Sequence, residues 1–436
     1  MNQSKLIHPF AIILHVTNLQ IYRATSFAFA LWWLATASQA ELAPLPASSS
    51  LIADLDRQNL TALAQGDRGV CSLFAITGLA EVESYRDESA PHRRLSEEYL
   101  IWAGRRISGS HGDQAMFYIA TAGLNALGVC PDALMPYAES TDPQREPSAE
   151  AQAMARDFGQ RWQIHWIKRW SLEAPLDENQ LLDIKRALVA GHPVACGMRW
   201  PKKPRGSELL EVPGAEEVFD GHSVMLVGYQ DDPAVKGGGM LRFRNSFGAD
   251  WGDHGYGAIS YAYAAAYAND AVWLSLGKPG SETPAVRYEA EDLKVTAKEQ
   301  CSAGPQKMNG YGVKMWSGGA QLFCGAKQGG WVELEFAAPE SGRYRLRALA
   351  TAAPDFGMVQ AALDEEKLSP EFDLYCGRVS PAGSLELGEH ELTQGAHRLR
   401  ISAVGKNPFS QGYSFGVDTV DLMHAEVAQT AQAKAE

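Results

Sequence analysis

Apolar residues follow two patterns in the first part of the chain. Residues 73–82 form an apolar run without proline, bounded by polar residues, and its length predicts a buried helix. Ser96 is a good N-cap for a second helix, with Glu97 and Glu98 in its first turn. Apolar or alternating segments further on predict strands of a small β-barrel at 194–198, 223–229, 240–244 and 257–261. These patterns together predict an α+β domain.

The pattern changes after a stretch rich in glycine, proline and serine, and we assign residues 278–286 to a linker. Short alternating strands then recur between glycines and prolines, at 331–336, 344–349, 359–363 and 397–401. Spacing of this kind predicts an all-β jelly-roll sandwich over residues 287–424. The alanine-rich residues 425–436 are predicted to be a disordered tail.

The N-terminal residues have the pattern of an export signal. Arg23 precedes an apolar run at 26–34 that is shorter than a membrane span, and Ala40 ends a plausible cleavage site. We therefore predict a signal peptide at residues 1–40 and an exported protein, secreted, periplasmic or bound to the cell surface. The alternative is a retained anchor, helped by a second apolar patch at 10–16.

Composition narrows the classes of partner. The formal net charge of −13 argues against nucleic acid, and no basic stripe is present for anionic lipid, so no membrane contact is expected after signal removal. Six cysteines in an exported chain favour disulfides. Setting Cys71 aside leaves an odd number, so at least one further thiol is expected to be free. Cys301 and Cys324 can pair within the second domain, but the spacing leaves the connectivity open.

Cys71 is the first candidate for chemistry. It lies between a glycine-containing turn and the apolar run at 73–82, in the first turn of the predicted helix, where free N–H groups and the helix dipole favour a thiolate. A lone cysteine beside an apolar helix is more often a small buried hydrophobe. Two further stretches change this interpretation: His222 leads into the apolar strand at 223–229, and Asn245 opens a segment rich in glycine and aromatic residues.

The order Cys, His, Asn, with His222 following Cys71 by 222 − 71 = 151 positions, is typical of a thiol protease. The three stretches, Q-x₅-C, G-H-S-V-x₂-V-G-Y and N-S-F-G-x₂-W-G-x₂-G-Y, resemble the papain-like cysteine peptidase family over about residues 63–261. The resemblance implies a two-lobed peptidase domain, with a helical lobe and a β-barrel lobe, which we place at residues 41–277.

The resemblance also implies the roles of four residues. Cys71 would be the nucleophile, His222 its base, Asn245 the group that orients the imidazole, and Gln65 a donor in the oxyanion hole. A neighbouring imidazolium would lower the pKa of the thiol further and give an ion pair. No cofactor is implied for catalysis, and the partner would be a peptide or protein.

The sequence departs from the family at three positions. Ser72 and Phe247 stand where the family usually has tryptophan, and Phe247 can still shield the bond between histidine and asparagine. Arg68 stands where the family often has a disulfide-bonded cysteine. None of these changes removes a reacting group.

The ends of the predicted sandwich, 288–292 and 416–422, resemble carbohydrate-binding modules. This resemblance implies a carbohydrate partner and a structural calcium, and the chain's acidic candidates for its ligands are Glu289, Glu291 and Asp418. The alternative is that these are ordinary surface carboxylates. Five aromatic residues are candidates for a sugar platform, of which Trp331 is expected in the core: Tyr311, Trp316, Trp331, Phe409 and Tyr413.

We therefore predict an exported cysteine peptidase that hydrolyses peptide bonds through a thioester, with a C-terminal module that targets glycan-bearing surfaces. Two alternatives stay open. One is a non-catalytic binding protein on a peptidase scaffold, in which the sandwich is the functional part. The other is an acyl transferase or amidase that uses the same three residues.

Overall fold

The computed structural model describes residues 44–87, 94–113, 115–159, 161–202, 209–278, 283–367 and 370–425. The predicted signal peptide, residues 1–40, lies outside the described residues, as does the tail from residue 426 and part of the predicted linker. The chain divides into two units, Met1–Leu45 and Pro46–Glu436, and every element below belongs to the second. None of the described helices is long and apolar enough to cross a membrane.

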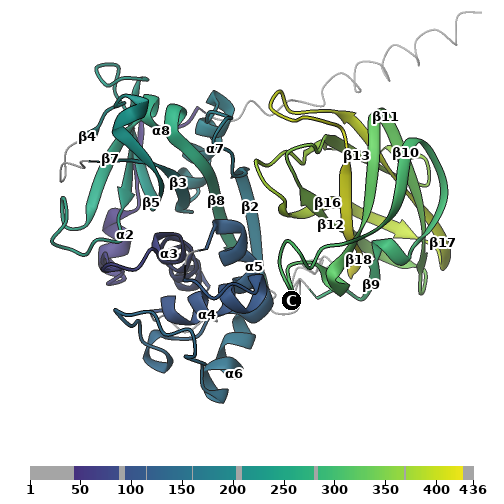
Figure 1. Ribbon diagram of the computed structural model, residues 1–436, viewed down its shortest axis with the longest axis horizontal. Coiled ribbons are helices and arrows are strands. Elements are labelled where there is room, and N and C mark those ends of the chain that lie inside the picture. The colour runs from purple at the N-terminus through teal and green to yellow at the C-terminus, as the bar shows by residue number, and fades with distance from the viewer. Residues whose placement is uncertain are drawn as a thin grey trace, which may run out of the picture. The chain divides into compact units, whose positions relative to one another are not determined.

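The described α-helices all lie in the first part of this unit, before residue 268 (Figure 1). They are α2 (Ile52–Arg57), α3 (Cys71–Arg86), α4 (Glu97–Ser108), α5 (Phe117–Leu127), α6 (Ala149–Phe158), α7 (Glu178–Val189) and α8 (Tyr261–Tyr267). Helix α3 is buried on all sides from its first residue to Ser84, which confirms the predicted buried helix. The hydroxyl of Ser96 accepts a hydrogen bond from the Tyr99 N–H at the start of α4, which confirms the predicted N-cap.

A mixed sheet packs against these helices in the order β2-β8-β3-β5-β6-β7-β4, with β1 paired to β5. Its strands are β1 (Ser48–Ser50), β2 (Trp162–Lys168), β3 (Val194–Pro201), β4 (Leu209–Leu210), β5 (Val218–Asp231), β6 (Gly239–Arg244), β7 (Tyr256–Ser260) and β8 (Ala268–Leu276). Strands β3, β5, β6 and β7 confirm the four strands predicted in this part of the chain. Helix α3 packs against β3, β5 and β8, and one hydrophobic core spans the helices and the sheet.

The C-terminal part, residues 286–424 (the β-rich part), consists mainly of strands and has a hydrophobic core of its own. Its strands are β9 (Val286–Glu289), β10 (Lys294–Lys307), β11 (Ala320–Ala338), β12 (Gly342–Ala352), β13 (Met358–Leu363), β14 (Glu366–Lys367), β15 (Phe372–Asp373), β16 (Ser380–Leu392), β17 (Gly395–Gly405) and β18 (Phe415–His424). Strand β11 is shared, because its first half pairs with β18 and its second half with β17. The four alternating strands predicted here are confirmed, and the jelly-roll topology stays a prediction.

All six cysteines are free thiols in this structure. Cys301 and Cys324 nevertheless lie on the paired strands β10 and β11, with Cys301 opposite Ala326 and Ala303 opposite Cys324. Their two thiols hydrogen-bond to each other. The expected partners are therefore neighbours, and a disulfide between them stays a prediction.

Candidate active site

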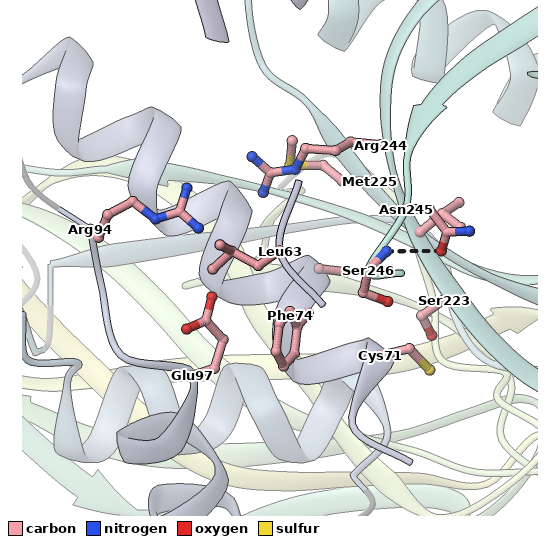
Figure 2. A pocket seen from close by; sticks show the side chains of 12 residues that line it. Leu63, Cys71, Phe74, Arg94, Glu97, Ser223, Met225, Arg244, Asn245 and Ser246 are labelled. Atoms are coloured by element: carbon pink, nitrogen blue, oxygen red, sulfur yellow. Dashed lines mark hydrogen bonds between the residues drawn. The ribbon is translucent and has the colours of Figure 1, made fainter. Parts of the chain in front are cut away.

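Cys71 is the first residue of helix α3 and is buried, and Figure 2 shows its side chain beside Ser223. Its Sγ lies 3.9 Å from the carbonyl oxygen of Gly221, and Ser223 hydrogen-bonds to it through both backbone and side chain. Burial raises the pKa of the Cys71 thiol, although the hydrogen bonds of Ser223 lower it in part. The expected lowered thiol pKa is therefore wrong for this structure, because desolvation outweighs the helix N-terminus.

His222 lies on β5, between the two residues that contact the thiol. Its Nε2 is 2.8 Å from Oδ1 of Asn245, so Nδ1 is the ring nitrogen left to face a nucleophile. The imidazole stacks on Phe247 with ring centroids 4.8 Å apart and also contacts Trp200, with ring centroids 4.4 Å apart. Burial lowers the pKa of His222 to about 4, and the bond to Asn245 offsets only part of this. Both shifts favour the neutral thiol and the neutral imidazole, which is contrary to the expected ion pair.

Asn245 follows the last residue of β6 and meets His222 because β5 and β6 pair with Met225 opposite Arg244. Its Oδ1 accepts a hydrogen bond from the Ser246 N–H at 2.8 Å in addition to its bond with His222. The Nδ2 of Asn245 is buried and has no hydrogen-bond partner. The predicted shielding of this contact by Phe247 is confirmed, since its ring stacks on the imidazole.

Each of the four polar atoms of Gln65 has a hydrogen-bond partner. Its Nε2 donates to the carbonyl oxygen of Arg68 at 2.6 Å, and its Oε1 accepts from the Ser246 hydroxyl at 2.5 Å. Its backbone N–H donates to the carbonyl of Ser246, and its own carbonyl accepts from the Tyr137 hydroxyl. A chain of hydrogen bonds thus runs from Gln65 through Ser246 and Asn245 to His222. The structure brings together all four residues predicted for this site.

A small cavity lined by Cys71 is also lined by Arg94, Glu97 and Arg244, charged residues that the sequence did not indicate as part of the site (Figure 2). The Nε of Arg94 lies 3.1 Å from Oε1 of Glu81, and a guanidinium nitrogen of Arg244 donates to the carbonyl of Leu60. Burial and the neighbouring Glu81 raise the pKa of Glu97 to about 8. These residues come from separate segments, so no sequence motif marks them.

The three predicted calcium ligands lie near one another at one end of the β-rich part. Glu289 ends β9 and Asp418 lies on β18, and Ser317 bridges them with its hydroxyl to Glu289 at 2.6 Å and its N–H to Asp418 at 3.0 Å. Burial, Glu289 and Glu291 raise the pKa of Asp418 to about 8.

One oxygen of Glu289 and one of Glu291 are buried without a hydrogen-bond partner, which fits a site for a hard cation. In the described part of the chain, however, no three acidic, histidine or cysteine side chains already stand in metal-holding geometry.

Known proteins resemble the first part of the chain. Residues 55–272 match the profile of the papain family of cysteine proteases. An uncharacterised peptidase C1-like protein of Acanthamoeba polyphaga mimivirus is 24% identical over 224 residues, which are 48% of this chain and 67% of that protein.

Among solved structures, xylellain, a cysteine protease from Xylella fastidiosa, is 22% identical with a TM-score of 0.45, covering 55% of this chain and 90% of its own. A clostridial cysteine protease after propeptide cleavage is 13% identical with a TM-score of 0.50 and covers 85% of this chain and 87% of its own. The likeness of fold to that protein extends beyond the family match.

Proposed function

Because the chain belongs to the papain family of cysteine proteases, we propose that it hydrolyses peptide bonds with Cys71, His222 and Asn245 as its triad. The observation that carries this proposal is the bond of 2.8 Å between His222 and Asn245. It fixes the imidazole between the two residues that contact the Cys71 thiol, beneath the ring of Phe247. The chain has all four residues that the chemistry requires, namely Gln65, Cys71, His222 and Asn245. Their presence favours a catalyst over a non-catalytic binding protein.

The reaction starts from a neutral pair. With Nε2 bound to Asn245, Nδ1 of His222 accepts the thiol proton of Cys71 as the sulfur attacks the scissile carbonyl carbon. The imidazolium then gives this proton to the leaving amine, and a thioester remains on Cys71. Water, deprotonated by His222, attacks the thioester, and the thiolate leaves and recovers its proton.

The oxyanion needs donors that are already in place. A glutamine amide has two N–H groups, and Gln65 uses one of them on the Arg68 carbonyl. The second is available to the oxyanion, together with the backbone N–H of Cys71 in the first turn of α3.

The activity can be tested with a fluorogenic peptide library, with and without an epoxide that traps thiols. Wild type should cleave a subset of peptides and lose activity with the epoxide, and Cys71→Ser should be inactive. Cys301→Ser is the matched control, since Cys301 is partly exposed in the β-rich part, and it should remain active. Mass spectrometry of the products separates hydrolysis from acyl transfer to an added amine. Activity that survives Cys71→Ser would reject the proposal.

Export and glycan targeting are the second part of the proposal. The signal-like N-terminus supports export, and a separate β-rich core supports a distinct targeting module. Tyr311 and Phe409 are 51% and 43% exposed, as a sugar platform requires, whereas Trp316 is buried. The expectation that Trp331 lies in the core is wrong, because Trp331 is partly exposed and its ring lies beneath the Arg400 guanidinium.

A glycan array probed with the full chain, and with Tyr311→Ala and Phe409→Ala, tests the targeting. Binding that one of these variants abolishes would support a sugar platform. Absence of binding to a broad array would make the module a protein-docking or stabilising domain.

We also propose that Glu289, Glu291 and Asp418 bind a calcium ion that stabilises the β-rich part. Support comes from the two buried carboxylate oxygens without partners and from the raised pKa of Asp418. A divalent cation would relieve the repulsion among the three carboxylates.

A further inference from the structure

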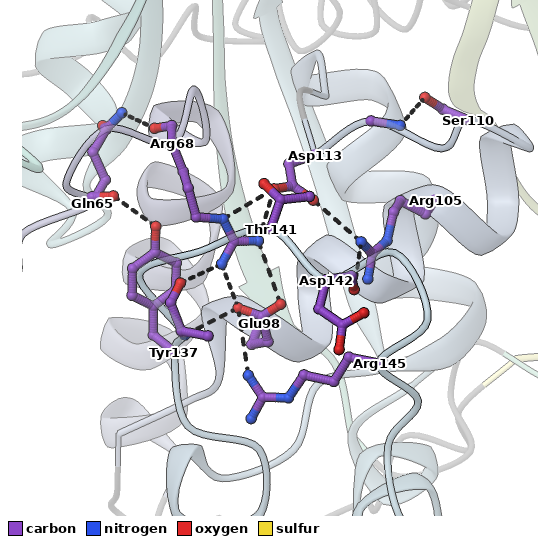
Figure 3. Close-up of polar contacts among 12 residues, drawn as sticks. Gln65, Arg68, Glu98, Arg105, Ser110, Asp113, Tyr137, Thr141, Asp142 and Arg145 are labelled. Carbon is purple, nitrogen blue, oxygen red and sulfur yellow. Dashed lines mark hydrogen bonds and ion pairs between the residues drawn. The ribbon is translucent and has the colours of Figure 1, made fainter.

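A buried arginine, Arg68, ties the turn that carries Gln65 to the helical part of the molecule (Figure 3). The Nε of Arg68 donates to Asp113 at 3.0 Å, and its Nη1 donates to Glu98 at 2.7 Å and to the Ala138 carbonyl at 2.5 Å. Its other terminal nitrogen lies 2.9 Å from Asp113. These contacts join the turn to helix α4, to the segment before α5 and to the loop after Met135.

The partners of Arg68 are buried, so these charge pairs are shielded from solvent. Side-chain exposure is 4% for Arg68, 0% for Glu98 and 6% for Asp113. Burial alone would lower the pKa of Arg68, but the hydrogen bond and charge of Glu98, with Asp113, raise it overall. Removing one member of such a group leaves buried charge without a partner, which makes its geometry costly to change.

Arg68 reaches Gln65 by two routes. Its backbone carbonyl accepts the hydrogen bond of 2.6 Å from the Gln65 Nε2. Its guanidinium lies 4.9 Å from the ring centroid of Tyr137, and the hydroxyl of Tyr137 donates to the Gln65 carbonyl at 2.7 Å. The side-chain amide of Gln65 and its backbone are thus both fixed to groups that Arg68 holds.

We infer that Arg68 is a positioning residue that orients Gln65 in the oxyanion hole, through its buried pairs with Glu98 and Asp113 and its contact with Tyr137. The inference rests on the proposed function, because it assigns Gln65 to that hole. Arg68 occupies the place at which the resembling family often has a disulfide-bonded cysteine. In this chain the ion pairs and hydrogen bonds of Arg68 take the place of that disulfide bond. The geometry of the oxyanion hole therefore does not depend on thiol oxidation.

The experiment compares two reactions of Cys71. A peptide aldehyde adds to the thiol and forms a hemithioacetal whose oxygen occupies the oxyanion hole, whereas iodoacetamide alkylates the same sulfur without an oxyanion. In Arg68→Met, kcat and aldehyde affinity should each fall about tenfold or more, with KM and the alkylation rate changed by less than about twofold. Arg68→Lys keeps the charge but not the planar fork, and should lie between wild type and Arg68→Met.

Arg105→Met is the matched control. The Nη1 of Arg105 also pairs with Asp113, at 3.2 Å, and Arg105 is likewise buried, but its hydrogen bonds go to Asp113 and to the Asp142 carbonyl and not to the turn that carries Gln65. This variant should lower the melting temperature and leave kcat and aldehyde affinity near wild type. If Arg68→Met does not fold, Tyr137→Phe removes only the hydroxyl bond to Gln65, and should lower aldehyde affinity about threefold with an unchanged alkylation rate.

Three results are decisive. Equal losses of kcat in Arg68→Met and Arg105→Met would overturn the positioning role and leave a general effect on stability. An unchanged aldehyde affinity in Arg68→Met would overturn it as well. If wild type cleaves no peptide but Arg68→Met still weakens aldehyde binding selectively, the proposed function is rejected while the role of Arg68 is retained.

Discussion

Two buried polar sites in this chain, one beside Cys71 and one beside Asp418, differ in how completely their polar atoms are paired. At the first, both side-chain polar atoms of Gln65 and the Nε2 of His222 have partners, whereas Nδ2 of Asn245 and Nε1 of the neighbouring Trp200 have none. At the second, carboxylate oxygens of two glutamates are buried without partners. The chain itself supplies partners for Gln65 and for Nε2 of His222 at the first site, whereas the second leaves carboxylate oxygens that the proposed calcium ion would bind.

The two sites also respond to pH in opposite directions. Burial lowers the pKa of His222 to about 4, below its unfolded value, so its contribution to stability is present above about pH 6.5 and lost as the pH falls toward 4. Burial and its acidic neighbours raise the pKa of Asp418 to about 8. The contribution of Asp418 to stability is therefore present below about pH 3.9 and is lost as the pH rises through 8.

The largest effect should follow from removing the base. His222→Ala should lower kcat on the order of 10⁴-fold, because it removes the group that we propose takes the thiol proton. The measurement is kcat on the best library peptide, and His390→Ala, in the β-rich part, is the control. Residual activity within tenfold of wild type would mean that the site is completed by a different base.

Gln65→Ala should act more weakly and mainly on the transition state. We expect kcat to fall about 10²-fold or more while KM stays within about twofold, since the lost N–H groups bind the oxyanion and not the ground state. Gln360→Ala, in the β-rich part, is the matched control. An unchanged kcat would place the oxyanion hole elsewhere.

Calcium should act only on the second site. At about pH 8 the full chain should gain about 2.7 kcal/mol of stability at a free calcium concentration about 100 times Kd, and less at about pH 5, where protons compete for the carboxylates. Thermal melting with calcium or chelator measures this gain. Asp418→Asn should abolish it, and the exposed control Asp355→Asn should keep it. The same gain in Asp418→Asn would end the metal proposal.

The smallest effect concerns how deeply His222 is buried. Because His222 must be neutral to act as a base, kcat/KM should stay level from neutral pH down to about pH 5 and fall near pH 4. Phe247→Ala removes the ring stacked on the imidazole and should move this acid limb upward by about one unit. Phe409→Ala, which removes an exposed aromatic residue elsewhere, should not. A wild-type acid limb near pH 6.5 would contradict the burial of His222.

The sequence predicted what is encoded locally. The apolar runs predicted α3 and the strands of both cores, and three short motifs located Cys71, His222 and Asn245. The direction of the pKa shifts could not be predicted, because it depends on how deeply Trp200 and Phe247 bury the imidazole. The contacts of Arg68 with Glu98 and Asp113 join residues 30 and 45 positions apart, and no local pattern marks such pairs.

The β-rich part shows the same division between local and tertiary information. Alternation predicted its strands, yet Trp331 on an alternating strand is partly exposed and Trp316, between strands, is buried. Which side of a strand faces the core is set by neighbouring strands, so alternation alone does not assign a residue to the inside.

The central claim, that Cys71 carries a covalent acyl group during hydrolysis, can be tested by acid quenching. Wild type mixed with a peptide ester and quenched within the first turnover should show the mass of one acyl group, and peptide mapping should place it on Cys71. Hydroxylamine should release it, as expected of a thioester. An acyl group on another cysteine, or turnover with no acyl group on any cysteine, would contradict the claim.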